Sequence, residues 1–453
     1  MEVFMTTKNE VLGYLPDECP PFVGLIFFAL QQIVVMFPAT VLVALITGFH
    51  VSTTIFASGL ATLGFILITG RQIPLYYGSS FSYIAAIASI MSAEAFASYS
   101  LNDKISIAQF GIVMSGFVSI IAGLIIQKSG KEKIDKVLPA TVTGSIAIII
   151  GLSLAANAMT NAASFPESAA AIPFAGSWAW TIAIITLIST ILFSVYLKGK
   201  LSQLPILFGL LTGYIAALII GNITGIPFVN FNTIESTKFF SLPIFTLPKP
   251  SLAALVAIMP IAIATIPEST AHVYQLDIYV NDLAKKKGVN KKYDIENKLG
   301  LNLIGDGMGD IISGFIGGPA GTNYGENISA MAISKNFSVY VLMLAAAFTM
   351  VISCFTPLIN IVYSIPTSVI GGLSIYLFGV IAAQGITIMI EKKVDMFSSK
   401  NLAVIAVILI VGLGGSFGFE GGMIPMFGVK VPAIASAAIV GILLNLVLSI
   451  GEK

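Results

Sequence analysis

Tyr77-Gly78-Ser79-Ser80-Phe81-Ser82 and, in the second half of the chain, Tyr324-Gly325-Glu326-Asn327-Ile328-Ser329 are the two related stretches that decide the fold. Each stretch overlaps the end of a glycine-containing piece that is expected to be extended, residues 73–78 for the first and residues 317–325 for the second. Both pieces lie inside apolar regions. A second related pair, Leu138–Gly144 and Ile365–Gly371, follows in the same order. The members of each pair are separated by about half of the chain, so the sequence predicts an internal repeat.

The composition around these stretches is that of a membrane protein. Hydrophobic residues make up 56% of the 453 residues and charged residues only 10%, whereas a soluble chain carries about 25% charged residues. One transmembrane helix needs roughly 20 apolar residues, so the chain could supply about a dozen helices or more. The net charge of +1 leaves no basic surplus for nucleic acid. We therefore expect an all-α polytopic membrane protein that does not bind nucleic acid.

Hydropathy and helix-breaking residues divide the chain into fourteen expected transmembrane segments. The segments cover residues 22–47, 52–70, 73–97, 107–127, 134–160, 175–197, 204–222, 251–275, 298–317, 318–335, 337–361, 365–391, 400–418 and 430–450. The third and tenth segments are each expected to begin with a short extended strand and only then to become helical.

The basic residues predict the orientation of these segments. With the N-terminus inside, 19 of the 23 Lys and Arg residues fall in cytoplasmic connections, which is the bias expected of inner loops. Both termini are then cytoplasmic. The related stretches lie seven segments apart, and because seven is odd, matched segments cross the membrane in opposite directions. Two inverted repeats of seven segments, with interrupted helices, are typical of secondary transporters that bind substrate near the midplane.

Glu268 and His272 are the first candidates for a site. They lie four residues apart in the eighth segment and so share one helix face. An ionisable side chain inside a span costs at least about 2.5–3.5 kcal/mol and therefore marks a functional site. Pro260 and Pro267 are expected to loosen the backbone and to leave carbonyl groups facing a cavity. We interpret Glu268 as a carboxyl group that takes up and releases a proton; the alternative is a buried pair that only joins helices.

Glu326 is the second candidate, because it follows Gly325 at the expected start of a half-helix. Free backbone N–H groups and the helix dipole make a polar pocket there, and the N–H groups near Phe81 are expected to face it from the third segment. Amide side chains of Asn327 and Gln32 complete the set. Two carboxyl groups would repel an anion, so the set suits a small, flat, neutral heterocycle with alternating N–H and C=O groups. The alternative role of Glu326 is a helix cap.

Other residues carry less specific signals. Asp306 and Asp310 are expected to form interhelical hydrogen bonds near the cytoplasmic end of the ninth segment, with direct substrate contact as the alternative. Two cysteines and two histidines in the whole chain predict no metal site and no cofactor. The sequence contains no HExxH motif, no phosphate-loop motif and no Ser/His/Asp set placed for nucleophilic attack, so no enzymatic activity is expected.

At these residues the chain resembles the nucleobase–ascorbate transporter family, and within it the bacterial uracil permeases. The resemblance runs from about Pro21 to the C-terminus, and the motifs that carry it are Gly78–Ser82, Glu268 with His272, and Asn323–Ile328 with Met331–Lys335. It implies a cytoplasmic tail (1–21), a core domain (22–127 and 251–361) that binds substrate, and a gate domain (134–222 and 365–450). It also implies an elevator-like movement of core against gate, and a homodimer formed through the gate in the lipid of the cell membrane.

The resemblance further implies roles for single residues. Glu268 and Glu326 would hydrogen-bond the base, the backbone near Phe81 and Gly325 would bind its carbonyl groups, and His272 would support Glu268 in proton coupling. The remaining expected substrate-site residues are Ser80, Tyr324, Asn327 and Gln32. A proton is the expected coupling ion, with sodium as the alternative.

The chain departs from the family pattern in four places. Ser329 and Ser334 stand where the signature usually has Gly and Thr, Gln32 follows Gln31 where many relatives have His, and Phe378 stands where similar uracil permeases tend to have Tyr. The function predicted from the sequence is proton-coupled uptake of uracil. Uptake of xanthine or another oxopurine is the first alternative. An anion transporter of the sulfate-permease kind is the second, and the two buried acids argue against it.

Overall fold

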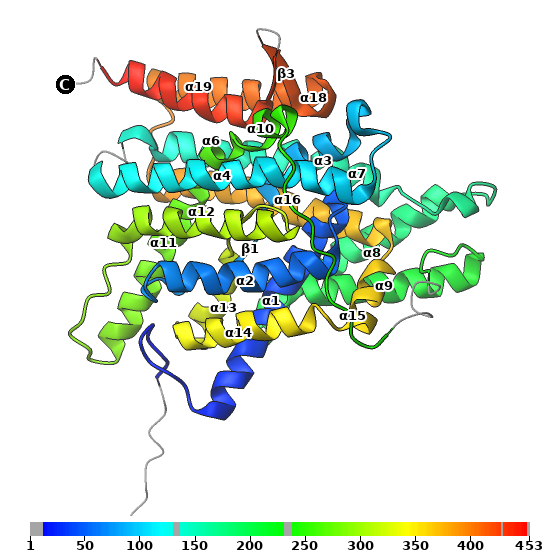
Figure 1. Ribbon diagram of the computed structural model, residues 1–453, viewed down its shortest axis with the longest axis horizontal. Coiled ribbons are helices and arrows are strands. Elements are labelled where there is room, and N and C mark those ends of the chain that lie inside the picture. The colour runs from blue at the N-terminus through cyan, green and yellow to red at the C-terminus, as the bar shows by residue number, and fades with distance from the viewer. Residues whose placement is uncertain (1–11, 130–135, 231–237, 427–428, 451–453) are drawn as a thin grey trace, which may run out of the picture.

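The chain folds almost entirely into helices, which differ widely in length (Figure 1). The computed structural model describes residues 12–129, 136–230, 238–426 and 429–450. The first half contains α1 (Phe22–Thr47), α2 (Val51–Ile68), α3 (Ile84–Ser92), α4 (Leu101–Ser129), α6 (Ala140–Ser153), α7 (Ala155–Ala162), α8 (Ala175–Tyr196) and α9 (Pro205–Thr224). The second half contains α10 (Leu252–Ile258), α11 (Ile261–Lys286), α12 (Leu299–Ile316), α13 (Gly325–Ser334), α14 (Val339–Ile352), α15 (Thr356–Tyr363), α16 (Thr367–Glu391), α17 (Ser399–Leu409), α18 (Gly415–Gly418) and α19 (Ala433–Leu448). Four short strands are also present: β1 (Tyr77–Ser79), β2 (Gly321–Asn323), β3 (Met423–Met426) and β4 (Val429–Pro432).

The predicted class, a polytopic membrane protein, is confirmed. Within the described residues, nine helical stretches are long and apolar enough to cross a membrane, and three shorter apolar helices accompany them. The nine are Phe22–Thr47, Val51–Ile68, Leu101–Lys128, Ala140–Ala162, Ala175–Tyr196, Pro205–Thr224, Leu252–Lys286, Thr367–Glu391 and Ser399–Gly418. The number of fourteen segments stays a prediction, because the other expected segments correspond to helices that are short or, like α12, carry acidic side chains.

The third and tenth expected segments do begin with strands. β1 and β2 form an antiparallel pair in which Gly78 lies opposite Thr322. The chains approach so closely that a Cβ atom at Gly78 would lie 2.3 Å from the ring of Tyr324. Only glycine therefore fits at position 78. β3 and β4 form a separate hairpin late in the chain.

Two backbone hydrogen bonds extend the β1–β2 pair symmetrically. Ser80 N donates to Ala320 O at 2.9 Å, and Tyr324 N donates to Tyr76 O at 3.0 Å. A helical turn begins directly after Ser80, as α13 begins directly after Tyr324. Ser80 and Tyr324 are thus equivalent, whereas the sequence comparison had placed Tyr77 opposite Tyr324. The sequence correspondence is wrong by three residues because it followed the repeated Tyr-Gly letters and not the strand ends.

The outer edges of this small sheet are covered by polar side chains. Tyr77 O accepts hydrogen bonds from Ser58 Oγ at 2.8 Å and Thr62 Oγ1 at 2.9 Å, both on α2. On the other edge, Gly321 N donates to Asp310 Oδ1 of α12 at 2.8 Å. Non-helical backbone at membrane depth needs such partners, because lipid supplies none.

The eighth expected segment extends beyond its predicted end, and the structure divides it into two helices. α10 ends at Ile258, and α11 starts after Pro260 and continues to Lys286. Pro267 lies inside α11 without interrupting it. Of the two prolines expected to loosen the backbone, only Pro260 stands at a break between helices. Proline is tolerated inside membrane helices where neighbouring elements satisfy the freed backbone groups.

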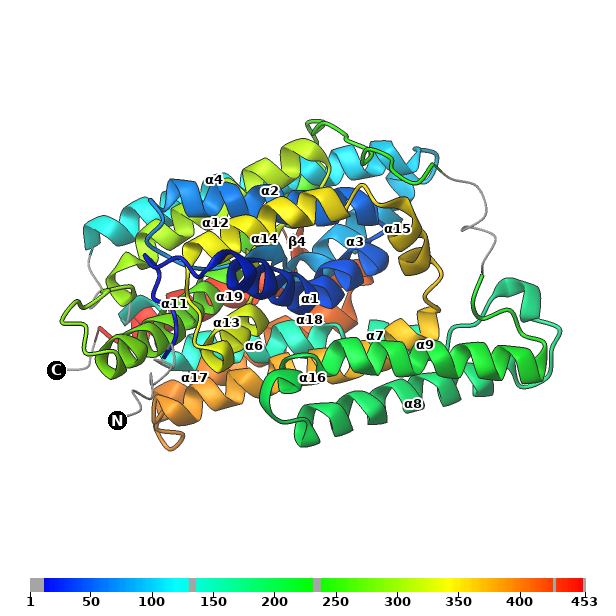
Figure 2. The same cartoon turned by 90° about the horizontal axis from the view of Figure 1, so that it is seen from below.

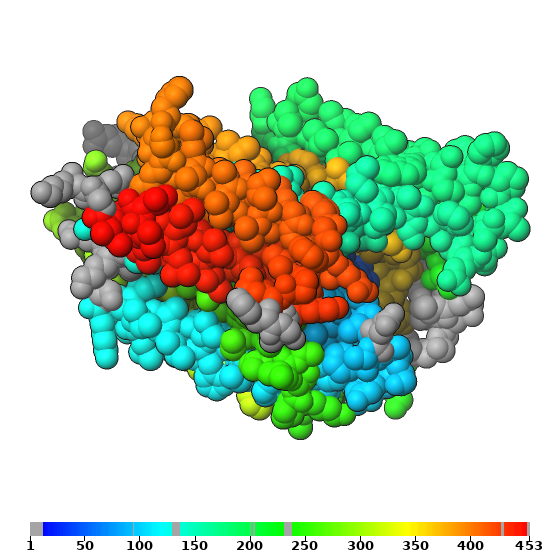
Figure 3. All heavy atoms as spheres, turned by 90° about the horizontal axis from the view of Figure 1, so that it is seen from above, coloured from blue at the N-terminus to red at the C-terminus, as the bar shows by residue number. Residues whose placement is uncertain are grey.

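The helices form two groups with further helices between them. In Figure 2, α2, α4, α12 and α14 lie along the upper side, while α8, α9, α16 and α17 lie along the lower side. α1, α3, α11 and α13 occupy the space between the groups. The space-filling view from above shows α17 to α19 (orange to red) beside the green α8 region, with α4 (cyan) on the other side (Figure 3).

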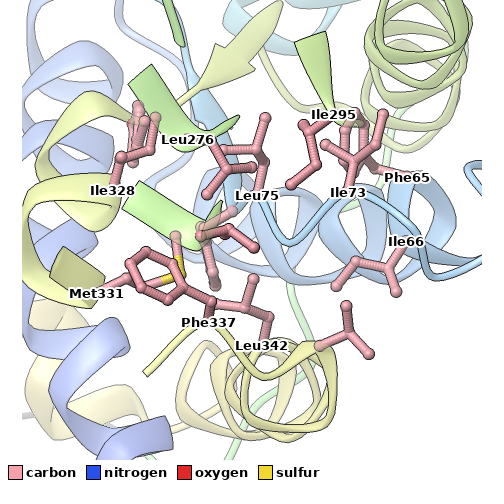
Figure 4. Close-up of a cluster of buried hydrophobic side chains, with 14 of the residues drawn as sticks. Phe65, Ile66, Ile73, Leu75, Leu276, Ile295, Ile328, Met331, Phe337 and Leu342 are labelled. Atoms are coloured by element: carbon pink, nitrogen blue, oxygen red, sulfur yellow. The ribbon is translucent and has the colours of Figure 1, made fainter. Parts of the chain in front are cut away.

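A buried apolar cluster holds the strand-bearing part together. It surrounds the extended residues Ile73 and Leu75, both fully buried. Figure 4 shows these residues packed against side chains from α2, α11, α13 and α14. The labelled members from those helices include Phe65, Leu276, Met331 and Leu342. The sheet and the start of α13 are therefore fixed to long helices on several sides.

The N-terminal segment, expected as a tail, is bound to the helices over its described residues. We call residues 12–19 the strap. Tyr14 N donates to Lys335 O and Phe337 N donates to Tyr14 O, both at 2.8 Å. Lys287 Nζ donates to Gly13 O at 2.8 Å, and Leu15 is fully buried. The strap joins the end of α11 to the connection after α13. Residues 1–11 of the expected tail lie outside the described part of the chain.

Candidate functional site

The site is organised around two helix starts that face each other across the β1–β2 pair. The 3-10 turn Phe81–Tyr83 leads into α3, and α13 starts at Gly325. The first backbone N–H groups of such helices have no partner within the helix. On the first of these turns, the side chain of Ser80 accepts a hydrogen bond from Ser82 N at 3.3 Å. Both helix starts that the sequence predicts are thus present, and the direction in which their N–H groups point stays a prediction.

Glu268 lies beside the first helix start. α11 carries it, and its Oε2 accepts a hydrogen bond from Ser82 Oγ at 3.4 Å. Glu326, in the first turn of α13, is close enough to repel Glu268 electrostatically and bonds its own backbone N–H. Both residues are intermediate in solvent exposure. The two predicted acids therefore belong to one site.

His272 lies next to the second helix start rather than on Glu268. Its ring hydrogen-bonds the backbone of Asn323, and a Cβ atom at Gly325 would lie 3.0 Å from its Nε2. Among the described residues, Nδ1 of His272 has no hydrogen-bond partner. The expected support of Glu268 by His272 is not present as a hydrogen bond. His272 instead holds the junction between β2 and α13.

Four of the predicted substrate residues lie behind the site and form its frame. Tyr324 donates its hydroxyl to Ser79 O at 3.0 Å. Asn327 Nδ2 donates to Gln32 O at 3.0 Å and to Gln32 Oε1 at 2.8 Å, which ties α13 to α1. Ser80, Tyr324, Asn327 and Gln32 are all buried. Their contact with a ligand stays a prediction.

Phe81 is the aromatic wall of the site. It is partly exposed, and its ring meets the ring of Phe378 edge to face, with centroids 6.0 Å apart and planes at 75°. Phe378 is buried in α16. The departure at position 378 noted in the sequence therefore affects the site through Phe81.

Asp306 forms the predicted interhelical hydrogen bonds, but at mid-helix. Its Oδ2 accepts from Ser269 Oγ at 2.7 Å and from Asn302 Nδ2 at 3.0 Å, and its Oδ1 accepts from Asn323 Nδ2 at 2.7 Å. These bonds join α11, α12 and β2. The expected location near the helix end is wrong, because the strand that Asp306 binds lies midway along α12.

Asp310 and Tyr77 are functional residues of the frame that sequence reasoning did not connect. The Tyr77 hydroxyl donates to Asp310 Oδ1 at 2.5 Å. Ser82 was also missed as a partner of Glu268. The spacing of four residues between Asp306 and Asp310 indicated that both carboxyl groups lie on one face of α12, but it did not identify the groups that they bind. Their partners lie far away in the sequence, and no local pattern identifies them.

The electrostatic character of the site is that of a neutral-ligand pocket. The carboxyl groups of Glu268 and Glu326 interact there, and those of Asp306 and Asp310 lie behind them, bonded to β1 and β2. In the described part of the chain, none of these four forms an ion pair with Lys or Arg. An anion entering the site would meet acidic groups without a compensating positive side chain. Donor and acceptor groups on a neutral ring would instead find partners of both kinds.

A family model and the sequences of known proteins point to the same family for this chain. The model of the Permease family matches residues 23–421. The uracil permease of Bacillus caldolyticus is 35% identical over 93% of this chain and 91% of its own length. The uracil permease of Bacillus subtilis is 34% identical over 98% of this chain and 96% of its own. The uracil permease of Escherichia coli is 32% identical, with 95% and 92% covered.

Solved structures with the same fold are far more distant in sequence. The murine Solute Carrier 26 family member A9 anion transporter in the inward-facing state matches with a TM-score of 0.62 and 13% identity, over 98% of this chain and 72% of that one. The transmembrane domain of the cyanobacterial bicarbonate transporter BicA matches with a TM-score of 0.56 and 14% identity, over 93% and 97%. These similarities establish a shared fold.

Proposed function

Because this chain belongs to the Permease family of nucleobase–ascorbate transporters, we propose that it takes up uracil together with a proton. It is a multi-pass membrane transporter and not an enzyme, since its relatives are named permeases. Its substrate belongs to the nucleobases. Uracil, the coupling ion and the transport movement are the specific parts of the proposal.

The observation that carries the substrate assignment is the pairing of two acids with two helix starts. Uracil is a flat neutral ring with N–H groups beside C=O groups. The carboxyl groups of Glu268 and Glu326 would accept its N–H hydrogens, and the backbone N–H groups after Ser80 and Tyr324 would donate to its carbonyl oxygens. Phe81 would cover one ring face. Xanthine and other oxopurines offer similar edges but a larger ring, which the Phe81–Phe378 contact disfavours.

Proton coupling is proposed for Glu268, with His272 as its neighbour on α11. Glu268 is partly buried, faces a second carboxyl group and has only a long hydrogen bond, 3.4 Å from Ser82. Two facing carboxyl groups disfavour simultaneous ionisation, so a proton between them relieves the repulsion. Binding of a proton would thus favour binding of the neutral base. Coupling to sodium is the alternative, and an experiment that compares uptake in proton and sodium gradients distinguishes the two ions.

Two inverted repeats of seven segments, with both termini cytoplasmic, are part of the proposal. The equivalent hydrogen bonds of Ser80 and Tyr324, and the equivalent starts of α3 and α13, support a two-fold relation centred on β1 and β2. Helix packing supports it too, since a Cβ at Gly116 of α4 would meet Gly307 O of α12, and one at Gly59 of α2 would meet Ala346 O of α14. The strap and the end of α19 both lie toward the left of the molecule in Figures 1 and 2.

The two groups of helices correspond to the proposed core (22–127 and 251–361) and gate (134–222 and 365–450). Contacts between them include Phe81 with Phe378 and the ammonium of Lys392 over the ring of Tyr274, 5.4 Å from its centroid. A movement of the core against the gate would have to break these two ring contacts. The exposed apolar side chains of α8, α9 and α17 would meet lipid and, in a homodimer, the gate of a second copy.

An anion transporter is the competing function on this fold, because both solved relatives above are named as anion or bicarbonate transporters. Their identity to this chain is below 15%, so they carry no substrate information. The acidic site argues against an anion, as described above. A large uncoupled anion current through the purified protein would overturn the nucleobase assignment.

Uptake of radiolabelled uracil into proteoliposomes tests the proposal. Uptake is expected to rise with an inward proton gradient and to be unaffected by a sodium gradient. Glu268→Gln is expected to abolish gradient-driven uptake while uracil still binds, whereas Glu167→Gln, at an exposed position, serves as the matched control. Uptake by Glu268→Gln that still follows the proton gradient would contradict the coupling role.

A further inference from the structure

A cavity lies apart from the Glu268–Glu326 site. Its volume is about 420 Å³, and it lies where the end of α1 and the middle of α3 face α7 and the start of α16. Leu45, Ile46 and Ala88 line it from one side. Asn157, Asn161 and Thr367 line it from the other. We call it the outer vestibule.

The vestibule lies at the end of the molecule away from the strap. α1 begins at Phe22, close after the strap, and ends at Thr47 beside the vestibule. A helix of 26 residues is about 39 Å long. In the orientation proposed above, the vestibule therefore opens on the external side. Asn157, Thr160 and Thr367 are exposed, so the cavity communicates with the surroundings.

An apolar cluster separates the vestibule from the central site. Ile370 lines the vestibule and also belongs to a buried cluster with Ile84, Leu373 and Leu377. Phe378 lies in the same cluster, and Phe81 packs against it from the central site. From Ile370 to Phe378, eight residues of α16 span about 12 Å. The vestibule and the central site are thus successive along one path, with an apolar plug between them.

The chemistry of the vestibule repeats that of the central site in a weaker form. The side chains that line it include amides and hydroxyls but no Asp, Glu, Lys or Arg. Asn157 and Asn161 lie four residues apart, so their amides share one face of α7. Each amide offers both a donor and an acceptor, while Ile46 and Ile370 supply an apolar wall. This lining suits a neutral flat ring with N–H and C=O groups and offers no charged partner to an ion.

We propose that the outer vestibule is an entry subsite for the nucleobase, in which Asn157 and Asn161 hydrogen-bond the ring before the apolar plug opens. This inference rests on the proposed function. The subsite binds more weakly than the central site, because its amides are exposed and no charge-assisted hydrogen bond is available there.

Protection of a thiol in the vestibule tests the subsite. Thr160→Cys is introduced into a chain in which Cys19→Ser and Cys354→Ala remove the native thiols. The purified protein in detergent is labelled with a water-soluble maleimide at increasing uracil concentration. Ser177→Cys, exposed at the start of α8 and outside the vestibule lining, is the matched control. At the uracil concentration that half-fills the subsite, the labelling rate of Thr160→Cys is expected to fall about twofold, with no change for Ser177→Cys.

The decisive arm repeats this labelling after Glu326→Ala has disabled the central site. Protection that persists at Thr160→Cys, and disappears when Asn157→Ala and Asn161→Ala are added, establishes a separate subsite. Protection that requires an intact Glu326 would show that uracil acts only through the central site and would overturn the subsite. Absence of protection in both backgrounds would overturn it as well. The proposed function fails on a different readout, the absence of uracil binding by the protein with Glu326 intact.

Discussion

The hydroxyl of Tyr77 donates to Oδ1 of Asp310 at 2.5 Å, and this single contact fastens β1 to α12. The same oxygen accepts from Gly321 N of β2 at 2.8 Å. One carboxyl group therefore binds both strands. Because the two helix starts of the site follow these strands, the same carboxyl group helps to fix their positions. The site therefore depends on the hydrogen bonds of this carboxyl group.

Asp310→Ala is expected to destabilise the protein and to weaken uracil binding. It leaves the Tyr77 hydroxyl and the Gly321 N–H buried without an acceptor, at a cost of about 1–3 kcal/mol for each group. Tyr77→Phe removes one hydrogen bond and leaves Asp310 bound to Gly321, so it should cost only about 0.5–1.5 kcal/mol. Thermal unfolding in detergent, with and without uracil, measures both. Equal losses for the two variants would show that the shared carboxyl group does not organise the strands.

Gly325→Ala is expected to lower uracil affinity by steric crowding. The added Cβ would lie 3.0 Å from His272 Nε2, so the ring or the start of α13 must move. Overpacking of this kind costs about 1–3 kcal/mol, which corresponds to about a 5- to 150-fold loss of affinity. Gly379→Ala on α16 is the control, because nothing lies within 4 Å of its added Cβ. Calorimetric titration with uracil should separate the two variants, and equal affinities would contradict the close approach of His272.

Phe378→Ala is expected to weaken uracil binding although Phe378 itself is buried. The edge-to-face contact with Phe81 is worth about 0.5–1.5 kcal/mol, so losing it should reduce affinity about two- to tenfold. Phe193→Ala removes a comparable ring contact, with Phe208 at 5.6 Å, between α8 and α9. Competition against radiolabelled uracil compares the variants. A loss of affinity in Phe193→Ala as large as in Phe378→Ala would mean that Phe81 needs no support from α16.

Attachment of the strap is expected to depend on acid pH through Asp17. Burial raises the pKa of Asp17, but hydrogen bonds from Lys291 and Tyr293 outweigh this effect and hold the pKa below its ordinary value. A lowered folded-state pKa stabilises the attachment above the unfolded-state pKa, and this contribution is lost as the pH falls through the folded-state pKa. The strap should therefore stay bound between about pH 5 and 8 and loosen below about pH 4.

The anisotropy of a dye on Cys19, which is exposed, follows the strap. Asp17→Asn should lower the anisotropy already at pH 7 and abolish the change at acid pH. The effect is small, about 0.2–1 kcal/mol, because the ion pair is largely exposed to solvent. Identical pH profiles for Asp17→Asn and the unaltered chain would contradict the role of Asp17.

The class of fold and the acids of the site could be predicted from the sequence for physical reasons. Lipid demands long apolar helices, so α1 and α9 begin and end close to the predicted boundaries. An acid at membrane depth is costly, and this cost is what singled out Glu268 and Glu326. Extended pieces with glycine, such as the one before Phe81, cannot be ordinary helices. The strands β1 and β2 were predictable on that ground.

The remaining features depend on long-range contacts. The bond between Tyr77 and Asp310 joins residues 233 positions apart, and no local pattern contains it. The resemblance implied that His272 supports Glu268, and a spacing of four places both on one helix face. In the structure the ring of His272 is held by the Asn323 backbone, because β2 passes on that side of α11. Which residues touch a ligand and which form the frame was decided by packing alone.

Calorimetric titration of uracil into purified Glu326→Ala, beside Glu167→Ala at an exposed position, tests the central claim most directly. If the carboxyl groups of Glu268 and Glu326 recognise the base, removing Glu326 deletes a charge-assisted hydrogen bond worth about 1.5–3 kcal/mol. The predicted result is about a 10- to 150-fold loss of uracil affinity in Glu326→Ala and no loss in Glu167→Ala. Unchanged affinity for uracil in Glu326→Ala would contradict the account.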